Sequence, residues 1–144
     1  MALPDDYVRL VATYGQGCFD DFLWVLSEGS GNPHLDLAEQ TRTMREILGR
    51  KQNPGLHATL ADHGVSATEL IQWATTDGAD SLLWLPVGPP GSWQTIVVEA
   101  GALSFSVLDQ STTAILFDLL RGALRLPQFP DDFPGDEPRF VPVD

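Results

Sequence analysis

Short apolar runs, or alternating apolar and polar residues, occupy the middle of the chain. They cover residues 70–75, 82–87, 95–99 and 103–107. Such runs, rich in β-branched and aromatic residues, are typical of strands. Residues 77–80, Asp-Gly-Ala-Asp, separate the first two runs, and Gly and Asp tolerate the positive φ angles of a tight reversal. The pattern therefore predicts an antiparallel meander.

Three other segments have the three- and four-residue apolar spacing of amphipathic helices. They cover residues 4–14, 35–48 and 112–121. Ser111 is suited to cap the last helix and Gly122 to end it. Residues 22–26 form a compact apolar run and predict one more strand, buried on both sides. The stretch from residue 53 to residue 66 has no sustained period and predicts a loop.

These elements predict one α+β domain over residues 1–126. We expect a twisted antiparallel sheet of about five or six strands, with helices packed on one face. Residues 127–144 are rich in Pro, Asp and Glu, a composition that cannot form an independent core. They predict an extended acidic tail that lies across an edge of the sheet and is partly held by Phe129, Phe133 and Phe140.

The charged residues are strongly biased toward acids. The 144-residue chain has 20 Asp and Glu against 8 Lys and Arg, a formal net charge of −12. No basic residue occurs between Lys51 and Arg121, whereas acidic residues recur throughout that interval. Such a charge repels phosphates and anionic membranes. We therefore expect no binding to nucleic acid or membrane, and a basic protein as the partner.

The histidines and the cysteine form no recognisable catalytic or metal-binding motif. His57 and His63 are six residues apart, which is neither a helical zinc pair nor a zinc-finger spacing. Cys18 is the only cysteine and suits a reducing compartment, and neither a secretory signal nor an apolar run of membrane-spanning length is visible. We expect a cytoplasmic protein with no enzymatic activity, no cofactor and no metal. A hydrolase would require His34, His57 and His63 all to contribute to turnover.

Several short motifs occur in a characteristic order. Near the start the chain reads Leu3-Pro4-Asp5-Asp6-Tyr7 and then Tyr14-Gly15-Gln16-Gly17, and later come Gly78, Asp80, Trp84 and Trp93. In this order and spacing the chain resembles the SUKH superfamily from Leu3 to about Gly122. That superfamily includes fungal cell-wall-assembly regulators and many bacterial immunity proteins against polymorphic toxins. Ala79 in the hairpin departs from the usual pattern.

The resemblance implies an immunity protein that binds and neutralises a cognate toxin domain. Because a nuclease must attract phosphate with Lys and Arg, an acidic inhibitor fits a basic nuclease-type toxin. The candidate contacts are five carboxylates with one of two aromatic anchors: Asp20, Asp21, Asp77, Asp80 and Glu99, with Trp73 or Trp93. These two tryptophans are expected to be partly exposed, and Trp24 and Trp84 to be buried. The alternative is a regulatory or scaffold module of the cell-wall-assembly-regulator type.

Overall fold

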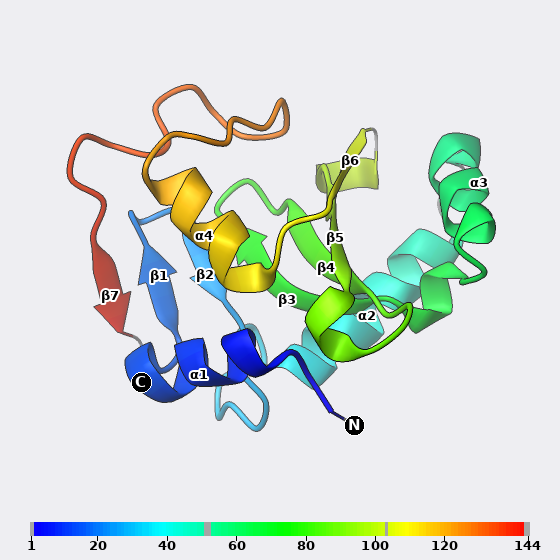
Figure 1. Cartoon of the computed structure of the whole chain (residues 1–144), viewed down its shortest axis with the longest axis horizontal. Coiled ribbons are helices and arrows are strands. Elements are labelled where there is room, and N and C mark those ends of the chain that lie inside the picture. The colour runs from blue at the N-terminus through cyan, green and yellow to red at the C-terminus, as the bar shows by residue number, and fades with distance from the viewer. Residues whose placement is uncertain (1, 51–52, 103, 143–144) are drawn as a thin grey trace.

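The computed structural model describes residues 2–50, 53–102 and 104–142 and confirms the α+β class. Its centre is a seven-stranded antiparallel sheet in the order β6-β5-β4-β3-β2-β1-β7 (Figure 1). The strands are β1 (Gly17–Phe19), β2 (Leu23–Val25), β3 (Ile71–Thr76), β4 (Ser81–Leu85), β5 (Gln94–Val98), β6 (Phe105–Leu108) and β7 (Phe140–Pro142). The sheet has more strands than the five or six predicted, because β1 and β7 have three residues each and leave no periodic signal.

The described residues form four α-helices, which cover both faces of the sheet. They are α1 (Asp5–Tyr14), α2 (Leu37–Arg50), α3 (Pro54–Asp62) and α4 (Thr112–Leu120). Figure 1 shows α1 and α4 on the near side of the sheet and α2 behind it. Helices were expected on one face only. All five residues of β4 are buried, so both faces of the sheet are covered and that expectation is wrong. Leu82 and Trp84 join the core under α1 and α4, and Leu83 and Leu85 join the core under α2 and α3.

The segment predicted as a loop contains α3, so that prediction is wrong. The Asn53 side chain accepts a hydrogen bond from the Leu56 backbone N–H at 3.1 Å, and Pro54 follows it in the first turn. Only Leu56 and Leu60 of this helix are buried. One apolar pair, four residues apart, is too short a pattern to reveal a nine-residue helix.

An aromatic cluster fills the core between the sheet and the two near helices. We define it as Tyr7, Trp73, Trp84 and Trp93. The Trp84 ring stacks on Trp73 at 6.1 Å between centroids and meets the Tyr7 ring edge-on at 4.8 Å. Each indole N–H has an acceptor: Trp84 donates to the Thr112 hydroxyl at 2.9 Å, Trp73 to the Thr95 hydroxyl at 3.3 Å and Trp93 to the Gly88 carbonyl at 3.0 Å. The cluster therefore joins α1, α4 and the central strands without an unpaired buried donor.

The motifs near the start of the chain have structural roles. Tyr7 donates its hydroxyl hydrogen bond to the Leu26 backbone carbonyl after β2. The Asp6 carboxylate accepts hydrogen bonds from the backbone N–H of Thr113 at 2.9 Å and from its hydroxyl at 3.0 Å. A carboxylate at this position satisfies an N–H of the first turn of α4 and complements the helix dipole. Gly17 is required by a close approach, because a Cβ there would lie 2.5 Å from the Val141 carbonyl oxygen.

The tail lies at the edge of the sheet as predicted, but residues 127–134 form turns and are not extended. Phe129 and Phe133 are buried, with ring centroids 5.3 Å and 4.6 Å from Phe22. Phe140 lies 4.7 Å from Phe19, and β7 then pairs with β1. The tail therefore provides the outermost strand of the sheet.

We expect Asp6→Ala to lower the free energy of unfolding by about 1–2 kcal/mol, because it removes the carboxylate oxygen that accepts both hydrogen bonds from Thr113 at the start of α4. Asp5→Ala is the matched control, since Asp5 is exposed and precedes Asp6 in the same helix turn. Urea unfolding followed by far-UV circular dichroism measures both. Equal stability of the two variants would contradict the capping role.

Candidate protein-interaction surface

Two turns at one end of the sheet place three carboxylates next to one another. The β1–β2 turn carries Asp20 and Asp21, with φ angles of 56° and 55°, and the β3–β4 turn begins with Asp77. The Asp77 backbone N–H donates to the Phe22 carbonyl at 2.9 Å, which fixes the two turns side by side. We call Asp20, Asp21 and Asp77 the acidic rim.

The thiol of Cys18 lies within the field of the acidic rim. Its pKa is raised to about 11, first by burial and then by the negative charges of Asp21, Asp77 and Asp20. All three rim carboxylates therefore lie close enough to Cys18 to raise its pKa. Because they carry the same sign of charge, they also repel one another.

No ion pair within the described part of the chain neutralises the acidic rim. The salt bridges there join Arg42 to Glu39, Arg50 to Glu46 and Arg121 to Asp118. The Asp20 carboxylate accepts the Gly135 backbone N–H at 2.6 Å, which brings the acidic tail against the rim. The backbone carbonyl of Arg139 accepts the Asp20 N–H at 2.6 Å. Asp21 and Asp77 are exposed and free to contact a partner.

Glu99 and Asp80 continue the acidic character toward the β5–β6 turn, but in different ways. Glu99 is half-buried and accepts a hydrogen bond from the Ser104 hydroxyl at 2.6 Å. Asp80 is 5% exposed, and its two oxygens accept the Thr76 hydroxyl and the Ala100 backbone N–H, each at 3.0 Å. Asp80 therefore joins two turns internally, and its predicted place on a binding surface is corrected.

The expectation of partly exposed Trp73 and Trp93 is also wrong. Trp73 is 0% exposed and Trp93 is 8% exposed, and both belong to the aromatic cluster. Polar neighbours in the sequence suggested exposure, but Thr76 is itself buried, the register of β3 shifts between Gln72 and Ala74, and Ser92 lies in the turn before β5. Neither indole can anchor a partner on the surface.

Trp24, expected to be buried, is instead the half-exposed tryptophan. It lies opposite Cys18 of β1 and Thr75 of β3 in the sheet, and Val141 of β7, opposite Cys18, is 48% exposed. Its indole N–H points to the Asp77 carboxylate at 3.5 Å. The continuous apolar run of residues 22–26 hid this side chain, because α2 and α3 pack over other strands of the same face.

The histidines are not part of this surface. His63 contacts the Thr59 carbonyl through Nδ1 at 2.9 Å, at the end of α3. Within residues 2–50, 53–102 and 104–142, no group of three His, Cys, Asp or Glu side chains is placed to hold a metal ion. None of the helices that the structure describes is both long and apolar enough to cross a membrane.

Comparison with known proteins gives no match: no protein-family model fits the chain, and neither a curated protein nor a solved structure is significantly similar to it. The resemblance to the SUKH superfamily therefore remains an expectation based on sequence motifs.

Ionisation of Cys18 should make stability depend on pH in the alkaline range. The thiol ionises near pH 9 in the unfolded chain and near 11 in the folded one. Its contribution to stability is therefore fully present below pH 9 and is lost as the pH rises toward 11. We expect the unfolding free energy of the native protein to fall by about 1–2 kcal/mol relative to Cys18→Ala over this range. Urea unfolding at a series of pH values measures both proteins. If their unfolding free energies changed in parallel with pH, the prediction would be wrong.

Proposed function

We propose that this chain is an immunity-type binding protein that captures a basic partner protein with the acidic rim and Trp24. One observation supports the proposal above all others. Three carboxylates from two adjacent turns converge beside a half-exposed indole, and no arginine or lysine among the described residues forms an ion pair with them. A cationic partner would neutralise them.

The arrangement costs stability in the free protein, because like charges repel at short range. A partner with Lys and Arg side chains relieves that repulsion on binding. Opposite fields also accelerate encounter and favour one orientation of the complex. Trp24 adds a flat apolar surface on which an Arg guanidinium or an apolar side chain can rest. The acidic rim raises the association rate and orients the partner, and the indole slows dissociation of the complex.

The partner we propose is a toxin domain of the nuclease type, inhibited in the cytoplasm. The motif resemblance supports an immunity role, and the negative charge supports a nuclease as the target. An enzyme that binds nucleic acid must present Lys and Arg to phosphate, and an acidic inhibitor occupies the same field. Co-expression with the toxin encoded beside this chain tests the proposal. Undiminished toxicity together with no isolable complex would refute it for that pair.

Removing two rim charges should slow association. For Asp21→Asn with Asp77→Asn, we expect about a tenfold lower association rate constant at low salt and a weaker dependence on salt. The control is Asp5→Asn with Asp62→Asn, two exposed carboxylates outside the rim that change the net charge equally. Stopped-flow or surface-plasmon measurements at several salt concentrations compare them. Equal slowing in both double variants would mean that net charge alone matters.

Truncating the indole should affect dissociation. We expect Trp24→Ala to weaken the complex by about 2 kcal/mol or more, mainly through faster dissociation, and Trp24→Phe to keep part of the affinity. Thermal unfolding of each free variant checks that the fold survives. An unchanged dissociation rate in a folded Trp24→Ala variant would remove Trp24 from the interface.

A further inference from the structure

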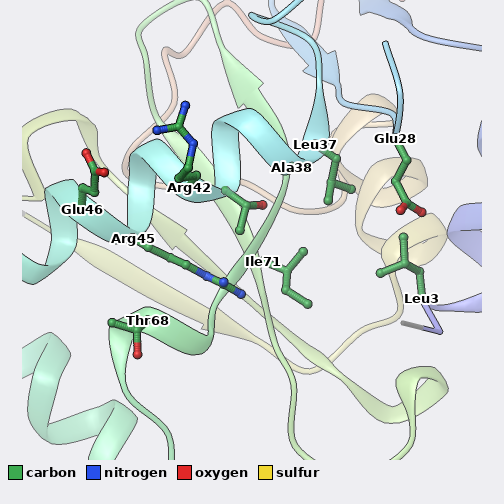
Figure 2. A pocket seen from close by; sticks show the side chains of 10 residues that line it. Leu3, Glu28, Leu37, Ala38, Arg42, Arg45, Glu46, Thr68 and Ile71 are labelled. Atoms are coloured by element: carbon green, nitrogen blue, oxygen red, sulfur yellow. The ribbon is translucent and has the colours of Figure 1, made fainter.

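A cavity of about 670 Å³ lies at the opposite end of β2 and β3 from the acidic rim. It opens between α2, the start of β3, the loop after β2 and the first residues of the chain (Figure 2). Its size falls within the range of sites that hold small molecules or short peptides. Nothing in the proposed immunity function uses it.

The floor of the cavity is apolar and rigid. Leu37 and Ile71 are 6% and 3% exposed and belong to the main core, and Leu3 packs against the same core. Ala38 completes the apolar lining. Figure 2 shows Leu3, Leu37 and Ile71 converging on one part of the cavity. This floor would desolvate an apolar ligand without rearrangement.

Arg45 provides a fixed positive charge in the cavity. Its Nε donates to the Leu70 carbonyl at 2.9 Å and its Nη2 to the Glu69 carbonyl at 3.5 Å. Both acceptors are neutral, and no salt bridge found among the described residues involves this guanidinium. Figure 2 shows the side chain extended beneath α2 toward Ile71. Since a guanidinium has five N–H donors, three remain for a ligand, and a carboxylate matches their geometry.

Glu28 places a negative charge at the other end of the cavity, while Arg42 and Glu46, which also line it, point above α2 in Figure 2. Figure 2 places Glu28 beside Leu37 and Leu3, away from Arg45. Leu37, Thr41 and Arg45 line the cavity at four-residue spacing on α2, so they span roughly 12 Å at 1.5 Å per residue. A free amino acid is shorter than this stretch of α2. An extended peptide advances about 3.3 Å per residue, so three or four residues span the distance.

We propose that this cavity binds the carboxylate end of a short apolar peptide, with the terminal carboxylate on Arg45 and the peptide amine near Glu28. The apolar side chains lie on Leu3, Leu37 and Ile71. The cavity shares no residue with the acidic rim. Its ligand is anchored by a negative carboxylate, whereas the rim binds positive side chains. The protein therefore has two recognition sites of different chemistry at the two ends of its central strands.

Calorimetric or NMR titration of the full chain with the tetrapeptide Leu-Val-Ala-Leu tests the proposal. We expect saturable binding of the free acid, and about tenfold weaker binding of the C-terminal amide, which loses the charge-assisted bonds to Arg45. N-acetylation should weaken binding about threefold, because it removes the amine that faces Glu28. Octanoate, which has the carboxylate but no amine and no amide groups, should bind more weakly than the peptide.

Three variants connect these differences to the named side chains. Arg45→Met should abolish the preference for the acid over the amide, whereas Arg50→Met, an exposed position on the same helix, should keep it. Because Arg45 also holds backbone carbonyls, Glu28→Gln gives a second test at an exposed residue: it should remove the effect of N-acetylation.

Three results would overturn the site. They are no saturable binding below about 5 mM, equal affinity for acid and amide, and binding of octanoate as tight as that of the peptide.

Discussion

The fold depends on the burial of the Trp84 ring with its N–H satisfied. This ring contacts Tyr7 of α1, Trp73 of β3 and Trp93, and donates to the Thr112 hydroxyl at the start of α4. A large aromatic group contributes most when it is fully buried, and its N–H carries a penalty of about 1–3 kcal/mol if it is left without an acceptor. One residue therefore determines where two helices sit on the sheet. The Asp6 carboxylate reinforces the same contact by capping α4.

This core leaves the two ends of the central strands with different roles. The acidic rim lies on the turns at one end of β2 and β3, and the cavity lies at their other end between α2, the start of β3 and the loop after β2, so the sheet separates the two. At one end the turns present exposed carboxylates and a half-exposed indole. At the other end the core surface itself becomes the floor of a cavity, with Arg45 held by backbone carbonyls. Loops positioned by a rigid scaffold are where proteins commonly place recognition.

Most of the fold was predictable from local pattern, because long periodic segments dominate it. Helices α1, α2 and α4 and strands β2 to β6 follow from apolar spacing and from caps such as Ser111. Helix α3 has one buried apolar pair, and β1 and β7 have three residues each, so none of them has a readable period. β4 is buried on both faces, which the apolar run did not indicate, because the helices that cover each face are brought there by distant contacts.

The sequence by itself determined the acidic bias, the antiparallel meander and the motif residues that build the core, because these depend on composition and on neighbours along the chain. Tertiary structure decided which groups reach the surface. Trp73, Trp93 and Asp80 became internal, and Trp24 became accessible, because burial depends on which segments pack over a strand. Residues 20 and 77 are distant in the chain, and only the pairing of β2 with β3 brings their carboxylates together.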